Sequence, residues 1–162
     1  LPMARSAVLI GRTVSDLVRN CITFVVMLAV SFWLIGFRFE GTLLEALLAT
    51  LLLLFFSYSL SWVQALFGLS VGSVEAANSA GFIWMFPMTF VSSAFVDPAS
   101  MPGWLQPIAD ANPFTIVTNA ARALYNGNPV GNDAIYSLMW SVGIIAVFAT
   151  LAIRKFERST VA

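Results

Sequence analysis

Long apolar runs, separated by short polar and charged segments, dominate the chain between Asn20 and Ile153. Each run lacks Lys, Arg, Asp and Glu, and each is near or above the ~20 residues that a helix needs to cross the hydrocarbon core of a bilayer. Inside lipid the backbone must satisfy its own hydrogen bonds, which favours helices. The four uncharged stretches are Asn20–Phe37, Ala46–Val74, Ala76–Val96 and Ala134–Ile153.

This pattern predicts an all-α integral membrane protein with four transmembrane helices. We expect the second helix to occupy only part of its stretch, because Gly68–Asn78 carries the small and polar residues of a turn. The chain is then a single membrane domain, residues 1–162. Its expected spans are residues 20–37, 46–67, 76–96 and 134–153.

Ahead of the first span, apolar residues recur at spacings of three and four between Met3 and Leu17. The opposite face carries Arg5, Arg12 and Asp16. This alternation predicts an N-terminal amphipathic helix within residues 1–19. Two interpretations remain open, namely an interfacial helix whose arginines contact anionic lipid and a helix that docks on a cytoplasmic partner.

The segment between the last two predicted spans, residues 97–133, contains two apolar runs that are too short to cross a bilayer, Gly103–Ala109 and Phe114–Tyr125. Runs of this length predict short re-entrant or interfacial helices. Asn112 followed by Pro113 is typical of a helix start. Arg122 would neutralise a carboxylate or reach the lipid headgroups. A structural lid and an outer gate or substrate exit are the two interpretations of the segment.

Within the spans, the most distinctive residue is Pro87, which removes one helix hydrogen bond and predicts a bend, either a static kink or a hinge. Ser57 and Ser61 lie one helical turn apart, as do Ala77 and Gly81. Small residues at this spacing favour close helix packing over contact with a substrate.

Composition narrows the possible functions. The chain is 59% hydrophobic and 10% charged, with a mean hydropathy of +0.88, whereas soluble domains are about 25% charged. Zero net charge without a basic run argues against nucleic-acid binding. An intramembrane hydrolase would need a serine with a His or Lys partner, but the sequence has no histidine and its only lysine is Lys155, in the tail. The lone Cys21 allows no intrachain disulfide.

The distribution of positive charge predicts the orientation. Six basic residues lie in the terminal segments, residues 1–19 and 154–162, and only Arg38 and Arg122 lie in the segments expected on the other side. The positive-inside rule therefore predicts a multi-pass protein of the plasma membrane with both termini of this chain cytoplasmic and residues 97–133 extracellular.

Four segments occur in an order that is similar to that of a known family. They read LPMARSAVLIGRTVSDLVR, LFGLSVGSVEAANSAGF, FIWMFPMTFVSSAFVDP and MPGWLQPIADANPFTIVTNAAR. In this order and spacing the chain resembles the C-terminal two-thirds of an ABC exporter type-2 permease of the daunorubicin-resistance kind. The family's first two spans have no counterpart in the chain.

The resemblance implies a permease subunit that moves an amphipathic drug or lipid-like substrate, driven by a separate cytoplasmic ABC ATPase. No GxxxxGK[ST] motif occurs in the chain, so we expect it to bind no cofactor or metal, to be no enzyme by itself, and to leave ATP to its partner. Further expected partners are a second permease chain, identical or not, and membrane lipids. The alternative is a truncated, non-transporting scaffold or a fragment of a longer permease.

The resemblance also implies residue roles. Arg5, Arg12 and Asp16 would couple the chain to the ATPase, and Pro87 would set the bend in the third span. The extracellular re-entrant segment would include Met101, Pro102, Trp104, Leu105, Asn112, Pro113 and Arg122.

Overall fold

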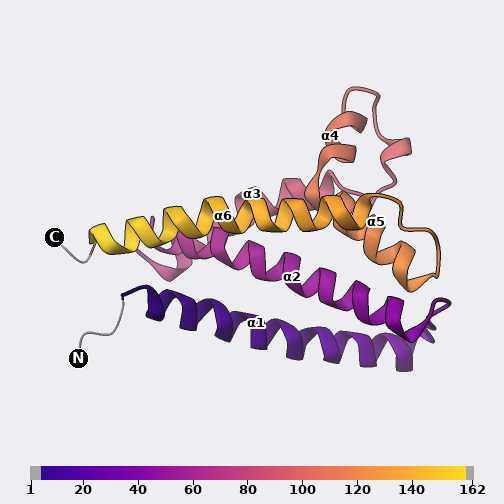
Figure 1. Ribbon diagram of the computed structural model, residues 1–162. Coiled ribbons are helices and arrows are strands. Elements are labelled where there is room, and N and C mark those ends of the chain that lie inside the picture. The colour runs from indigo at the N-terminus through magenta and orange to yellow at the C-terminus, as the bar shows by residue number, and fades with distance from the viewer. Residues whose placement is uncertain (1–4, 160–162) are drawn as a thin grey trace.

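The computed structural model describes residues 5–159, with side-chain detail from Val14 to Phe156 except at Val74. All regular elements within this range are helical, as the sequence predicts. Three long helices run side by side, α1 (Arg5–Val30), α2 (Leu43–Gly68) and α6 (Asp133–Ser159) (Figure 1). The start of α1, the end of α6 and the α2–α3 turn lie at one end, here called the inner end (Figure 1).

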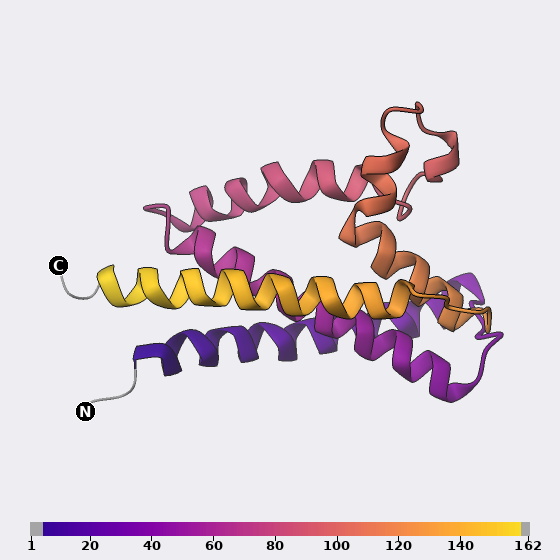
Figure 2. The same ribbon diagram turned by 45° about the horizontal axis from the view of Figure 1, so that its top comes forward.

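The remaining elements are shorter. The π-helical turn η1 (Ser31–Ile35) follows α1 directly, and α3 (Val74–Phe90) returns from the inner end. At the other end, here called the outer end, lie the 3-10 turn η2 (Pro98–Ser100) and helices α4 (Gln106–Ala111) and α5 (Pro113–Tyr125). Figure 2 shows α5 beside α2 and α6, with α4 and η2 standing away from them.

Three helical segments are long and apolar enough to cross a membrane, Val14–Ile35, Leu43–Gly68 and Asp133–Phe156. This finding supports a multi-pass membrane protein. Helix α3 has 17 residues, or about 25 Å at 1.5 Å per residue, and it is not among the three. It ends at Phe90, whereas the sequence pattern predicted a span up to Val96. The count of four spans therefore remains a prediction.

The described part of the predicted amphipathic segment and residues 20–30 of the first predicted span form one continuous helix, α1, from Arg5 to Val30; the rest of that span lies in η1 and the two residues after it, and residues 1–4 lie outside the described residues. The sequence pattern predicts a boundary at Asn20, where the charged residues stop. Backbone geometry does not follow that boundary, since residues 17–23 contain no Gly or Pro that would interrupt a helix. The π-helical turn ends at Ile35 and is followed by Gly36, whose φ of 69° is left-handed and suits glycine.

Helix α2 is the centre of the bundle and packs against α6, α5 and α1. Its Leu52 and Phe56 form a buried cluster with Val117 and Ala120 of α5. Small residues are buried along α2 and α6, so the backbones of the two helices can approach closely. Within lipid no hydrophobic effect drives helices together, and close packing of this kind stabilises their association instead. These small residues are Ala46, Ala49, Ser59, Ser137, Ser141 and Ala152.

A capping box fixes the start of α2. The Thr42 hydroxyl accepts from Glu45 N at 3.2 Å, and the Glu45 carboxylate accepts from Thr42 N at 2.6 Å. This reciprocal arrangement satisfies two backbone donors at the helix start. The predicted start at Ala46 is therefore one turn too late.

The α1–α2 connection is joined to the end of α5. Glu40 N and Gly41 N both donate to Tyr125 O, at 3.2 and 3.3 Å, and Phe39 stacks on the Tyr125 ring at 5.3 Å. The Tyr125 hydroxyl lies 3.0 Å from Thr50 Oγ1 of α2. Burial raises the pKa of Tyr125, and the hydrogen bond with Thr50 offsets part of that effect, so the phenol stays neutral at physiological pH.

Candidate functional site

Asn112 joins the end of α3 to the start of α5. Its Nδ2 donates to Met88 O at 2.7 Å and to Val91 O at 2.6 Å, and its Oδ1 accepts from Phe114 N at 2.9 Å. The side chain is 4% exposed. Helix ends leave carbonyl and amide groups without helical partners, and Asn112 supplies partners to both ends at once. The predicted cap at Asn112 and Pro113 is confirmed.

A second link joins the exit of α3 to α5. Ser93 N donates to Thr115 Oγ1 at 3.1 Å, and Ser93 Oγ donates to Asn119 Oδ1 at 2.7 Å. Arg122 Nη2 donates to Ser93 O at 3.1 Å. Three side chains of α5 thus hold one residue of the loop through its backbone and its hydroxyl. Bonds from a guanidinium to a carbonyl are stronger than neutral bonds, so Arg122 adds most to this link.

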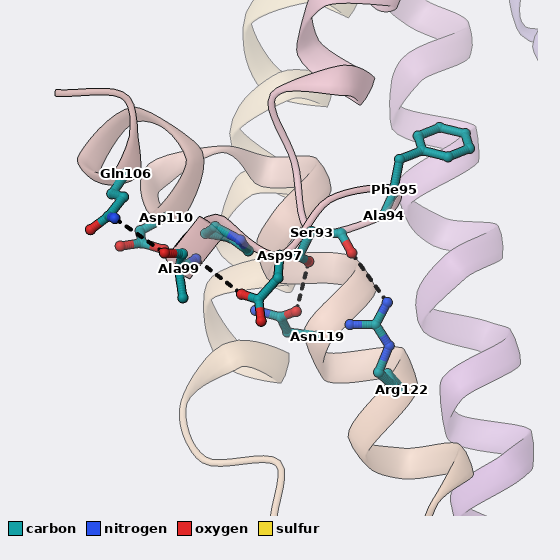
Figure 3. Close-up of a pocket in the computed structure, with 10 residues that line it drawn as sticks. Ser93, Ala94, Phe95, Asp97, Ala99, Gln106, Asp110, Asn119 and Arg122 are labelled. Atoms are coloured by element: carbon teal, nitrogen blue, oxygen red, sulfur yellow. Dashed lines mark hydrogen bonds between the residues drawn. The ribbon is translucent and has the colours of Figure 1, made fainter. Parts of the chain in front are cut away.

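Above this link lies a pocket of about 580 Å³, the outer pocket, shown in Figure 3. Asn119 and Arg122 line its α5 side. The Asp97 carboxylate, which accepts from Ala99 N at 3.0 Å, lies near Asn119, and Asp110 of α4 lies near Gln106 (Figure 3). The pocket is therefore lined by two carboxylates and one guanidinium.

This arrangement can bind a polar ligand but has no catalytic set. No group of three or more His, Cys, Asp and Glu side chains in the described part of the chain could hold a metal ion. Arg122 and Asp97 already hold parts of the loop, which leaves Asp110 as the carboxylate with the most freedom. A cationic group, or a group that donates a hydrogen bond, would find an acceptor in the Asp110 carboxylate.

The predicted outer residues divide into two groups. Asn112 and Arg122 hold the α3 exit, and Arg122 lines the outer pocket. The run Met101–Leu105 lies beside the pocket without lining it. Within this run Met101 is buried and its carbonyl accepts from Gln106 Nε2 at 2.9 Å, while Trp104 is 73% exposed.

Sequence reasoning missed Ser93, Asp97, Asp110 and Asn119. One signal was available, because Asn119 lies three residues before Arg122 on the helix predicted there, and residues at this spacing share a face. The contribution of Ser93 had no local signal, since it precedes Arg122 by 29 residues.

The predicted coupling residues lie toward the inner end of α1. The side chains of Arg5 and Arg12 lie outside the described set, although the backbone there is helical. Asp16 lines a second hollow, between α1, α2 and α3. Pro87 lies in the last turn of α3, with its side chain exposed, and Val91 N donates to its carbonyl at 2.9 Å.

Comparison with known proteins adds independent information. Residues 1–126 match the ABC-2 type transporter family. The chain is 36% identical over 160 residues to the daunorubicin resistance ABC transporter permease protein of Streptomyces coeruleorubidus, covering 97% of this chain and 55% of that protein. It is 28% identical over 161 residues to a probable doxorubicin resistance ABC transporter permease protein of Mycobacterium tuberculosis, covering 99% of this chain and 58% of that protein.

The chain thus spans little more than half the length of these relatives. No solved structure matches it significantly. The family match covers every element from α1 to α5, including the Asn112 cap and the Arg122 link. The chain therefore belongs to the ABC-2 type transporter family.

Proposed function

We propose that this chain is the membrane part of an ATP-driven exporter that moves an amphipathic drug or lipid-like substrate outward. The observation that carries the proposal is the match along nearly the whole chain to a drug-resistance permease, together with three apolar segments of membrane-spanning length. Hydrolysis would belong to a separate cytoplasmic ABC ATPase, because the chain has no P-loop motif of its own.

The continuous helix α1 supports a mechanical role in this scheme. Its 26 residues correspond to about 39 Å. A movement of its first turns would therefore be transmitted along the helix to the middle of the bundle, because no break in the helix lies between them. Along its length α1 contacts α2, which in turn contacts α5 and α6. Closure of the ATPase would then move packed helices as a unit and alternate access between the two sides.

The outer segment would close the other end of the path. Helix α5 and the α3 exit are held by Asn112 and Arg122, and short helices of this kind fit a re-entrant arrangement. In this scheme the outer pocket is the last polar binding site that the substrate meets before its release. A second permease chain, identical or different, would complete the path.

Coupling is tested by charge reversal at Arg5 and Arg12 in the permease co-expressed with its ATPase. We expect Arg5→Glu with Arg12→Glu to abolish co-purification of the ATPase and drug-stimulated hydrolysis, because repulsive contacts replace attractive ones. The matched control is Arg154→Glu with Arg158→Glu, which makes the same charge change at the same end, on α6.

Equal losses in both double variants would refute specific docking by α1. A lipid-anchoring role predicts a different result, in which insertion or orientation suffers and the correctly inserted fraction keeps its ATPase.

Orientation is tested by labelling single cysteines in a Cys21→Ser background. Ser73 precedes α3 at the inner end and Ser100 lies in η2 at the outer end, and both are exposed. We expect a membrane-impermeant thiol reagent on intact cells to label Ser100→Cys and to spare Ser73→Cys and Ser159→Cys. Labelling of Ser73→Cys from outside would contradict cytoplasmic termini and four crossings.

A further inference from the structure

Polar side chains gather toward the inner end of the bundle, around a hollow of about 590 Å³ between α1, α2 and α3, here called the inner pocket. It reaches from the middle of α2, at Ser57, to the α2–α3 turn at Gly72. It is separate from the outer pocket, with which it shares no lining residue. Most of its α1 and α2 lining belongs to segments long and apolar enough to cross a membrane.

Helix α2 contributes a polar stripe to this pocket. Ser57, Ser61 and Gln64 all line it, at spacings of four and three residues that place them on one face. Polar side chains within a spanning helix are costly against lipid and mark functional surfaces when they face a cavity. Ser57 and Ser61 were predicted to serve helix packing; Ser57 does bond to Asn20 of α1, and both serines also line the pocket.

The hydrogen bonds of this stripe leave capacity for a ligand. Asn20 Nδ2 of α1 donates to Ser57 Oγ at 2.8 Å, and Ser61 Oγ donates to Tyr58 O at 2.7 Å. The Gln64 amide forms no hydrogen bond with the described residues. It therefore presents two donors and an acceptor, and the Asn20 carbonyl presents another acceptor.

Gly81 of α3 provides the space that the Gln64 amide occupies. A Cβ built at Gly81 would lie 2.5 Å from Gln64 Nε2 and 2.6 Å from Oε1, which is closer than atoms can approach. Any side chain at position 81 would therefore push the amide out of its place. Gly81 itself does not line the pocket, but its missing side chain lets the exposed Gln64 amide, which does line it, lie against α3.

The charge and apolar character of the lining define the ligand class. Asp16 and Arg19, both on α1, contribute one charge of each sign, so the pocket is neutral overall. Leu60 and Met85 add apolar contact surface. A molecule with an apolar body and a hydroxyl- and carbonyl-bearing polar part matches both kinds of surface.

We propose that the inner pocket binds the polar part of a neutral amphiphile, such as a glycoside or polyol, that enters from the cytoplasmic leaflet. Hydroxyl and carbonyl groups of the ligand bond with Gln64, Asn20 and Ser61. The assignment of this site to the loading step rests on the proposed export function. Binding itself does not, and it is measured without nucleotide or ATPase.

The probe is a short-chain alkyl glucoside that carries a fluorescent group, bound to the purified permease in phosphatidylcholine nanodiscs and followed by anisotropy. We expect Gln64→Met and Gly81→Ala each to weaken binding about 3- to 10-fold, the range for one or two lost hydrogen bonds. Gly143→Ala on α6 is the matched control, because a Cβ there meets no atom within 4 Å. A permethylated probe should bind the wild type as weakly as the variants bind the free glucoside.

Unchanged affinity in both pocket variants, or equal binding of the glucoside and its permethylated form, would overturn the proposal. Competition by a glucosyl diacylglycerol in the nanodisc would identify a lipid headgroup as the source of the ligand, and its absence would identify a free glycoside. Probe binding with the expected variant losses but without ATP-driven transport would keep the inner pocket and reject the export function. ATP-driven transport that neither variant changes, together with no probe binding, would keep the export function and reject the inner pocket as a binding site.

Discussion

Replacement of Asn112 is the sharpest test of how the outer end is held together. Asn112→Ala removes the cap of α5 and both amide bonds to the end of α3. An N-cap contributes about 1 kcal/mol, and each amide bond contributes about 1 kcal/mol more. We therefore expect the free energy of unfolding to fall by about 3 kcal/mol.

Asn112→Ser separates the two functions of the side chain. A serine hydroxyl still caps α5 but cannot reach Met88 O and Val91 O together, so the expected loss is about 2 kcal/mol. Asn128→Ala is the control, because Asn128 is an exposed asparagine at the same end. Surface substitutions of this kind change stability by about 0.5 kcal/mol or less.

The assay is equilibrium unfolding of the purified permease in mixed micelles of a mild detergent and SDS, followed by tryptophan fluorescence. The expected order of stability is wild type and Asn128→Ala, then Asn112→Ser, then Asn112→Ala. A loss below about 1 kcal/mol in Asn112→Ala would refute the inference that this side chain joins α3 to α5. Equal losses in the Ser and Ala variants would show that the cap contributes nothing.

Three further substitutions probe local features. Thr42→Ala breaks the capping box with Glu45 and should cost about 1 kcal/mol in the same assay; no loss would reject the box. Gly127→Ala should destabilise more than Gly131→Ala, because both have positive φ but a Cβ at Gly127 also meets backbone 3.0 Å away; equal losses would contradict that close approach. Pro87→Ala restores a backbone donor and should raise the melting temperature while transport falls; unchanged transport in vesicles would make Pro87 incidental.

The apolar pattern predicted the long helices well because each is defined within its own window. Helix α2 begins three residues before the predicted Ala46 and ends one residue after the predicted end. Its start was readable from Thr42 and Glu45, which have the spacing of a capping box. The amphipathic pattern over the first residues also predicted a helix correctly, although it did not reveal that α1 continues without a break.

The end of α3 could not be predicted in the same way. Hydropathy stays high through Val96, yet the helix ends at Phe90. Part of the reason lies far along the chain, because Asn112 supplies partners for carbonyl groups that a longer helix would bond internally. A window of adjacent residues contains no information about a partner 21 residues away.

The two pockets likewise combine features that the local sequence predicts with features that depend on distant residues. Sequence order singled out Asn112 and Arg122, but it did not indicate that they bond to the end of α3 and to the loop after it. The inner pocket could not be predicted from the sequence because its walls come from three helices. The position of Gln64 in it depends on the contact with Gly81, which only the packed structure shows. Contacts between helices follow from packing, which residue spacing within one helix does not specify.

The most direct test of the central claim is ATP-dependent transport in inside-out vesicles that contain the permease and its ATPase. We predict accumulation of at least one amphipathic candidate drug that requires both proteins and hydrolysable ATP, and that disappears in the Arg5→Glu, Arg12→Glu variant. An ATPase that binds the permease and hydrolyses ATP while no candidate amphiphile accumulates would contradict the account, and would identify the chain as a membrane scaffold.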